Sequence, residues 1–423
     1  MKPSSTQELL ARRSEVLGAS YRLFYEEPIH LVRGVGVEVF DSQGTRFLDA
    51  YNNVPIVGHC NARVIKAQCD QASVLNSHTR YLSEGVIRYA EKLIATMDSH
   101  LTQVMFTCTG SEAIDLALRM VRLPGQAQGI VITENAYHGV TAAASAVSPS
   151  LGSGYVQEPW IRRVAVPRRV PRGQVAEFFA EGVRLAIADL QDSEYGFSAL
   201  LMDMAFVSDG VFLQPPGFIA AACQLAHDSG GLVIADEVQS GFGRTGAVMW
   251  GYHYHGIRPD LVIMGKSMAN GLPVGGVVGT PEIMDRFANR GRYFNTYGGN
   301  QVCMAAAEAV LDVIQDDCLL KHAERVGSHL QEQLSHVCAP FGSRVVVSGA
   351  GLLAGLEFRD EMDELDPKMS ASILNGFRRS GVLVGQCGPA NSSIKIRPPL
   401  PFTETNVDEL SGALSALLGQ LPL

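Results

Sequence analysis

The sequence predicts an α/β fold, with a large domain built on a mostly parallel sheet and a small α+β domain at the C-terminal end. Between about residues 100 and 280, apolar runs of strand length alternate with stretches of helical spacing, which is the pattern of a parallel sheet covered by helices. Beyond Asn300 the pattern changes to long helices followed by further strands. The chain has 423 residues, of which 46% are hydrophobic, so it can bury a large core and form two or three domains.

The N-terminal segment, residues 1–60, is expected to pack beside the small domain. Residues 6–20 have helical spacing, with Leu9 and Leu10 on one side. Residues 35–49 alternate apolar and polar positions around an Asp-Ser-Gln-Gly turn, which predicts a hairpin.

The large domain is assigned to residues 61–310. Helices are predicted at Ser111–Val121 and Phe218–His227, and the stretch Leu151–Gly173, which has little periodicity, is predicted to be a long loop. The apolar runs that we expect to be strands are Val104–Cys108, Gly129–Thr133, Ala199–Met204, Leu232–Ala235, Leu261–Met264 and Val274–Val278.

The small domain is assigned to residues 311–423. A helix at 302–315 leads into it, and a second is predicted at Leu320–Leu334. The strand candidates that follow are Arg344–Val347, Leu352–Phe358, Val382–Val384 and Ile394–Arg397.

Composition excludes several classes of function. The net charge of −9, with no basic run, argues against non-specific binding of nucleic acid. The eight cysteines include no Cys-x-x-Cys pair, so we expect thiols in a reducing compartment and no metal site. The sequence has neither a secretory signal nor an apolar run long enough to span a bilayer, so we expect a cytoplasmic protein with no membrane partner.

A lysine and an aspartate stand at the ends of two predicted neighbouring strands. Lys266 follows the run Leu261–Met264, and Asp236 follows the run Leu232–Ala235. A lysine amine can form a Schiff base with the aldehyde of pyridoxal phosphate, and an aspartate can pair with the pyridinium nitrogen. Either residue alone is more typical of a solvated lysine or a helix cap. Together they predict a pyridoxal phosphate site with Lys266 and Asp236 as catalytic residues.

The cofactor phosphate is expected where a strand gives way to a helix at Thr109-Gly110-Ser111. Free backbone N–H groups at a helix N-terminus bind anions, and the helix dipole favours negative charge there. Thr109 and Ser111 add hydroxyl donors. The alternative is an ordinary helix start in which Ser111 is the cap and no ligand binds.

Other loop residues are candidates for the cofactor ring and the substrate. Tyr137 can stack on a flat ring, although a buried loop tyrosine is the alternative. Gln239 could donate to the phenolic oxygen, and Thr296 is a second phosphate donor in its own subunit or a partner's. Arg397 could hold a carboxylate or a phosphate, although a solvated arginine before a proline turn is the alternative.

Together these motifs resemble the class III pyridoxal-phosphate-dependent aminotransferases, which have fold type I. The resemblance implies a homodimer with the active site at the subunit interface, cofactor contacts from Tyr137 and His138, and Thr296 reaching the partner's cofactor phosphate. The matching segments occur in the family's order, and they are Thr109–Ala113, Tyr137–Gly139, Ala235–Gln239, Gly241–Arg244, Gly265-Lys266 and Thr296–Asn300.

A narrower resemblance is to the phospho-lyases of this family, which act on phosphoethanolamine or 5-phosphohydroxylysine. It rests on residues 52–54, 58–60, 75–82 and 293–296. The chain departs from the ω-aminotransferases at Ser208, where those enzymes carry a glutamate that neutralises the substrate-binding arginine. It also has Asn61-Ala62 where the family has His-Pro.

These features predict a phospho-lyase that expels phosphate and ammonia from a phosphorylated amine, leaving an aldehyde. The alternative is a class III aminotransferase that moves the amino group to a keto acid, and a third hypothesis is an inactive binding protein of this fold. A phospho-lyase needs a second anion site, for which the candidates are Arg80 and Arg397, helped by Asn52, Asn53 and Tyr81. A structural salt bridge is the alternative role of Arg80.

Overall fold

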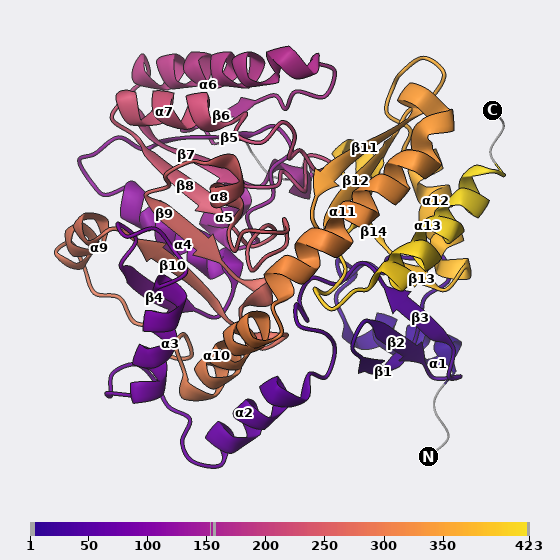
Figure 1. Cartoon of the computed structure of the whole chain (residues 1–423). Helices are drawn as coiled ribbons and strands as arrows, with labels where there is room; N and C mark the ends of the chain where they lie inside the picture. The colour runs from indigo at the N-terminus through magenta and orange to yellow at the C-terminus, as the bar shows by residue number, and fades with distance from the viewer. Residues whose placement is uncertain (1–4, 153, 155–157, 421–423) are drawn as a thin grey trace.

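A seven-stranded sheet forms the centre of the protein. The computed structural model describes residues 5–152, 154 and 158–420 (Figure 1). The strand order is β4-β10-β9-β8-β7-β5-β6, and only β10 runs antiparallel to both of its neighbours. The strands are β4 (Gln103–Thr107), β5 (Gly129–Thr133), β6 (Ile161–Val164), β7 (Phe197–Asp203), β8 (Leu232–Asp236), β9 (Leu261–Met264) and β10 (Gly275–Gly279). The predicted mostly parallel sheet is confirmed.

Both faces of this sheet are buried, which explains why its strands are apolar at almost every position. In β9, Leu261 and Ile263 pack into one core cluster, whereas Val262 and Met264 pack into another. The first cluster contains residues of α4 (Gly110–Val121), α5 (Ala142–Ala146) and α9 (Pro281–Ala288). The second contains residues of α3 (Glu84–Ile94), α6 (Val175–Gln191), α7 (Ala220–Asp228), α8 (Gly251–His255) and α10 (Gln301–Asp316).

A second, antiparallel sheet lies beside the first, on the right in Figure 1. Its order is β11 (Val345–Ala350), β12 (Leu353–Phe358), β15 (Ser393–Ile396) and β14 (Gly385–Cys387). The helices around it are α11 (Leu319–Cys338), α12 (Pro367–Arg379) and α13 (Glu404–Leu418). The predicted small α+β unit is therefore present.

The N-terminal segment forms a third sheet with a strand from the C-terminal region. Its strands are β1 (Leu31–Val35), β2 (Glu38–Asp41), β3 (Arg46–Asp49) and β13 (Val382–Leu383), and β13 pairs with β3 in parallel. Before it stands α1 (Thr6–Val16), which has no buried residue, and after it comes α2 (Ala62–Ala72). This pairing places residues 31–49 against the small unit, while the domain boundaries at 60 and 310 stay a prediction.

Two sequence predictions were incomplete. The stretch Leu151–Gly173 contains β6, whose Ile161-Arg162-Arg163-Val164 sequence has too few apolar positions to be typical of a strand, because it lies at a sheet edge and pairs only with β5. Strand β14 was missed because it has only three residues. Short 3₁₀ helices lie at Pro149–Leu151, Arg172–Gln174, Lys266–Ala269, Ala339–Arg344 and Pro389–Asn391. Within the described ranges, no helix is both long and apolar enough to cross a membrane.

Candidate active site

A cavity of about 270 Å³ lies at the carboxyl ends of β8 and β9, facing the N-terminus of α4. This is the edge of an α/β sheet at which ligands usually bind. Five segments that are far apart in the sequence meet there. The lining includes Thr109, Gly110, Ser111, Tyr137, His138, Gly139, Asp236, Val238, Gln239 and Lys266.

Lys266 begins the 3₁₀ helix that follows β9, with a φ of 25°. Burial of its side chain, together with the positive charge of Arg397, lowers the pKa of Lys266 to about 8. A larger fraction of the amine is therefore neutral near physiological pH than for an exposed lysine, and a neutral amine can attack a carbonyl carbon.

Asp236 presents a fixed carboxylate to the same cavity. Its Oδ1 accepts the backbone N–H of Val238 at 3.0 Å, and its Oδ2 lies 2.7 Å from Nδ1 of His138. The neighbouring carboxylate, Asp203 of β7, instead accepts the N–H groups of Ala205 and Val207, which close the turn after that strand. Burial, and then the charge of Asp236, raises the pKa of Asp203 to about 6.

The loop before α4 can hold an anion. Thr109 is the N-cap and accepts the N–H of Glu112 at 3.1 Å, so the expected alternative of a cap at Ser111 is wrong. The backbone N–H groups of Gly110 and Ser111 have no partner within the helix, as at any helix start. A Cβ at Gly275 would lie 2.4 Å from the carbonyl oxygen of Thr109, so only glycine lets β10 approach this loop.

Arg397 is buried against the cavity wall, which contradicts the alternative of a solvated arginine. Its side chain donates to the carbonyl oxygen of Tyr51 at 3.0 Å and to Oε1 of Gln239. Asn53 also donates to Oε1 of Gln239, at 3.1 Å. Because two donors occupy this oxygen, the amide N–H groups of Gln239 are left to donate elsewhere.

Lys395 was not among the residues predicted from the sequence. It lies beside Arg397 near the ring of Tyr51, whose centroid is 5.9 Å from Nζ of Lys395 and 4.8 Å from the guanidinium carbon of Arg397. Burial, and then the charge of Arg397, lowers the pKa of Lys395 to about 7. The signal was present, because residues two apart in a strand point to the same face and Ile394-Lys395-Ile396-Arg397 alternates.

Other predicted residues lie away from the cavity lining. Asn52 caps a local turn by accepting the N–H of Val54 at 3.1 Å. Arg80 is exposed, with its guanidinium 3.8 Å from the ring centroid of Phe294, and no ion pair of Arg80 occurs in the described structure. Tyr81 is exposed and stacks on His78, and Thr296 is exposed two residues after Phe294.

Comparisons with known proteins agree with this arrangement. The family model described as aminotransferase class-III matches residues 24–418. A Drosophila melanogaster protein named alanine–glyoxylate aminotransferase 2-like is 34% identical over 96% of this chain and 85% of its own. A Caenorhabditis elegans protein named ethanolamine-phosphate phospho-lyase homolog 1 is 31% identical over 98% of this chain and 94% of its own.

Among solved structures, a phospholyase from Arthrobacter in complex with phosphoethanolamine has a TM-score of 0.93. It is 38% identical to this chain, and the match covers 98% of this chain and 100% of the other. A Bacillus anthracis aminotransferase has a TM-score of 0.89 but is only 24% identical, so it supports the fold alone.

Proposed function

Because the chain belongs to the class III aminotransferase family, a family of pyridoxal-phosphate-dependent enzymes of fold type I, we propose that it is a phospho-lyase acting on a small phosphorylated amine such as phosphoethanolamine. The overall reaction consumes water and yields phosphate, ammonia and an aldehyde. In this reaction the carbon–oxygen bond to the phosphate breaks.

The donor groups of the cavity fit pyridoxal phosphate. This cofactor supplies an aldehyde that reacts with amines and a ring that accepts electrons. Lys266 would hold the aldehyde carbon, Asp236 the ring nitrogen, and Gln239 the phenolic oxygen through its free N–H groups. The N–H groups of Gly110 and Ser111 would hold the phosphate. His138, whose buried Nε2 has no partner in the described structure, orients Asp236 through its other nitrogen.

Lys266 would also move the proton of the reaction. Its amine is buried and its pKa is lowered to about 8, so it can take a proton from the amine-bearing carbon near neutral pH. In a phospho-lyase, loss of this proton is followed by departure of phosphate from the neighbouring carbon. In an aminotransferase, Lys266 would pass the proton on without loss of phosphate, and a keto acid would have to bind next.

The observation that carries the proposal is the pair Lys395 and Arg397 beside Lys266. In the described structure, neither basic side chain forms an ion pair with a carboxylate, and Arg397 is held by an amide oxygen and a carbonyl oxygen instead. By its resemblance to the ω-aminotransferases, the chain has Ser208 where those enzymes carry a glutamate that would neutralise such an arginine. A phosphate monoester carries close to two negative charges at neutral pH, so its binding would favour the protonated form of Lys395, whose pKa is about 7 without it. Two cations then suit the phosphate better than one.

An aminotransferase is the second candidate, since relatives of similar identity carry that name. The two reactions differ in their need for an amino acceptor. We therefore expect the purified enzyme, incubated with phosphoethanolamine and no keto acid, to release phosphate, ammonia and aldehyde in equal amounts. Ethanolamine and the Lys266→Ala variant serve as controls. In a second incubation that contains a keto acid, consumption of the keto acid without phosphate release would establish the aminotransferase.

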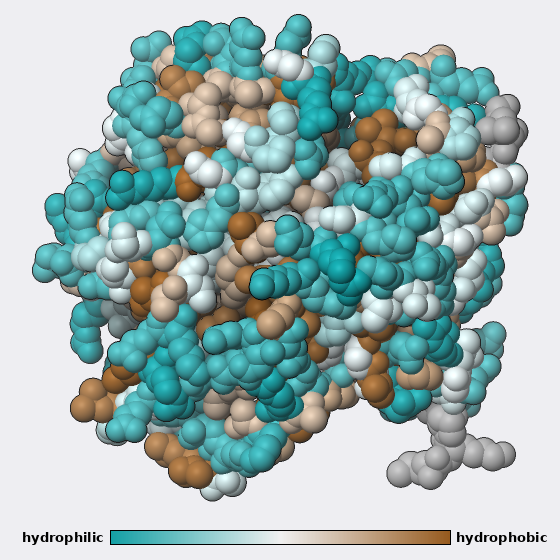
Figure 2. Space-filling model, in the orientation of Figure 1, coloured by the Kyte–Doolittle hydropathy of each residue, from teal (hydrophilic) through white to brown (hydrophobic). Residues whose placement is uncertain are grey.

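Arg80 and Thr296 fit a shared active site. Both lie on exposed surface around Phe294, away from the cavity of their own chain. Exposed apolar side chains lie nearby in sequence, at Leu75, Tyr81 and Leu82. Figure 2 shows small apolar groups at the lower left, where the ends of α2 and α3 lie, within a mostly hydrophilic surface. We propose that a second copy covers this surface and receives both residues in its own site. The cytoplasmic location stays a prediction.

A further inference from the structure

We propose that Asp49 and His59 form a positioning pair that fixes the substrate-facing wall of the active site. The inference rests on the proposed function and adds two residues that line no part of the cavity. Asp49 ends β3 and is 3% exposed, and His59 lies in the loop before α2. The sequence motif Gly58-His59-Cys60 had no assigned role.

The carboxylate of Asp49 joins two loops. Its Oδ1 accepts the backbone N–H of Tyr51 at 3.1 Å and that of Asn52 at 2.9 Å. Its Oδ2 lies 2.6 Å from Nε2 of His59. One oxygen therefore shapes the turn that follows β3, while the imidazole holds the other oxygen in place.

His59 is anchored from its backbone. Its N–H donates to the carbonyl oxygen of Gly36 at 2.7 Å, and the N–H of Gly36 donates back to the carbonyl of His59 at 3.0 Å. A Cβ at Gly34 would lie 2.9 Å from Cβ of His59, so a glycine there lets the side chain lie against β1. The imidazole is thus tied to the N-terminal sheet at a fixed place.

The turn shaped by Asp49 contacts three residues in or beside the site. The carbonyl oxygen of Tyr51 accepts from Arg397 at 3.0 Å, and Asn53 donates to Gln239 at 3.1 Å. The carbonyl oxygen of Asn53 accepts from Ser267, the neighbour of Lys266, at 3.0 Å. A shift of this turn would move the partners of Arg397 and Gln239 together.

A role in folding alone does not explain this pair. A buried carboxylate loses its hydration, which costs free energy of folding. An apolar side chain of similar size would often stabilise a core at least as much as the carboxylate does. The carboxylate accepts backbone groups of a turn that reaches both Arg397 and Gln239. Its burial therefore serves the geometry of the site.

The first test compares substitutions that remove one bond at a time. Asp49→Asn can still accept the two backbone N–H groups but loses the charged bond to His59. His59→Phe keeps a ring and loses that bond, while His59→Gln keeps an amide N–H that can replace it. We expect Asp49→Asn and His59→Phe each to raise KM for phosphoethanolamine about tenfold, with a smaller change in kcat and a Tm within about 3 °C of wild type.

Two comparisons separate positioning from general damage. His59→Gln should recover part of the KM, and the double variant Asp49→Asn/His59→Phe should be no worse than the worse single variant, because both remove the same bond. Asp41→Asn is the matched control: Asp41 likewise accepts two backbone N–H groups, from Gln43 and Thr45, but lies in an exposed turn. We expect Asp41→Asn to leave KM unchanged.

The second test does not depend on turnover. Hydrogen exchange of residues 50–54, measured with and without cofactor, should be faster in Asp49→Asn and His59→Phe than in wild type or Asp41→Asn. Unchanged exchange and unchanged KM in both variants would overturn the positioning role, as would a KM rise in Asp41→Asn of the same size. If wild type releases no phosphate, the proposed function fails, while exchange in this segment still decides the role of the pair.

Discussion

At the scale of single residues, Asp236 supplies the one charge that the proposed cofactor ring needs. In Asp236→Asn, the amide oxygen can still accept the N–H of Val238, so the strand end should keep its shape. The amide cannot stabilise a protonated ring nitrogen by charge. We expect kcat to fall by about a hundredfold or more with the cofactor still bound, measured by steady-state kinetics and cofactor absorbance. A rate near that of wild type would show that another group supplies the charge.

Lys395 has a predicted effect on both substrate binding and stability. Lys395→Met should raise KM for a phosphorylated amine more than for the same amine without phosphate, because a cation beside the anion is lost. The pKa of Lys395 is lowered to about 7 in the fold, against about 10.4 in an unfolded chain. Between these values the unfolded chain binds more protons, so wild-type stability rises with pH.

The methionine variant lacks this titration. Its Tm relative to wild type should therefore be higher at a pH of about 6.5 than at a pH of about 9.5, which a pair of thermal melts can measure. Lys368→Met, a substitution of an exposed lysine at the start of α12, is the control and should show no such difference. A Tm difference that does not depend on pH would contradict the lowered pKa of Lys395.

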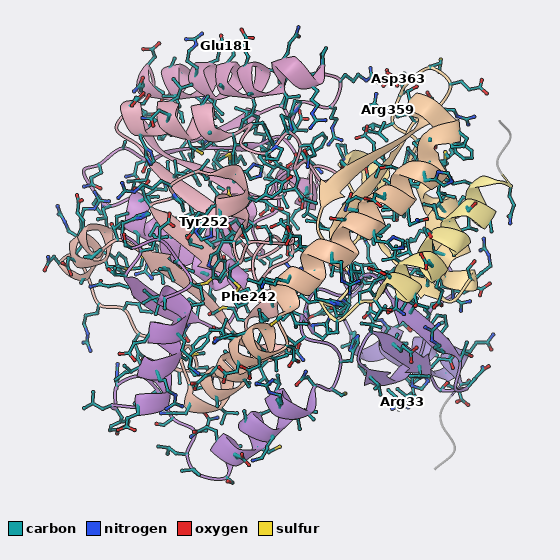
Figure 3. The ribbon with its side chains drawn as sticks, viewed as in Figure 1. Arg33, Glu181, Phe242, Tyr252, Arg359 and Asp363 are labelled. Carbon is teal, nitrogen blue, oxygen red and sulfur yellow. The ribbon has the colours of Figure 1, made fainter. Side chains whose placement is uncertain are left out.

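At the scale of elements, the loop after β8 joins the large sheet to the small unit. Phe242 of this loop lies near the centre of the molecule, close to the N-terminal end of α11 (Figure 3). Arg244 is fully buried, and its Nη1 donates to the carbonyl oxygens of Leu352 and Pro398, the residue after Arg397. In the described structure its Nε and Nη2 have no partner.

This arrangement predicts opposite effects on stability and function. Arg244→Met removes a buried charge with unpaired donors, so we expect an equal or higher Tm. It also releases Pro398, so KM for the phosphorylated amine should rise. Arg244→Lys, which keeps one donor, should restore much of the KM. A large loss of Tm in Arg244→Met with an unchanged KM would make Arg244 a purely structural residue.

The elements also show what the sequence could predict. The strands β5 and β9 were placed correctly because both faces are buried and nearly every position is apolar. The edge strand β6 was not predicted, because its residue types do not indicate a strand and it becomes one only by pairing with β5. Lys395 was missed for a related reason: its place beside Arg397 depends on packing near Tyr51, which lies far away in the sequence.

At the scale of the whole molecule, a parallel sheet explains why the cofactor candidates could be predicted together. Lys266 and Asp236 end adjacent parallel strands, so the fold must bring them to one edge. Arg80 and Thr296 follow no such rule. They lie on exposed surface outside the cavity lining, and the second copy that we propose would bring them near a substrate.

A shared active site predicts complementation between two inactive proteins. Lys266→Ala lacks the reacting amine but keeps Arg80, whereas Arg80→Ala keeps the amine but cannot contribute Arg80 to a partner. If Arg80 acts in the partner's site, a mixed dimer contains one site with both native residues. Unfolding and refolding an equal mixture should then restore about a quarter of wild-type activity, since about half of the dimers are mixed and each has one complete site of two.

A mixture of Lys266→Ala with Asp236→Asn is the control, because both residues line the same cavity of one chain. It should recover no more activity than Asp236→Asn retains alone. If the mixture of Lys266→Ala with Arg80→Ala also recovers no activity, Arg80 acts in the site of its own chain or takes no part in the reaction.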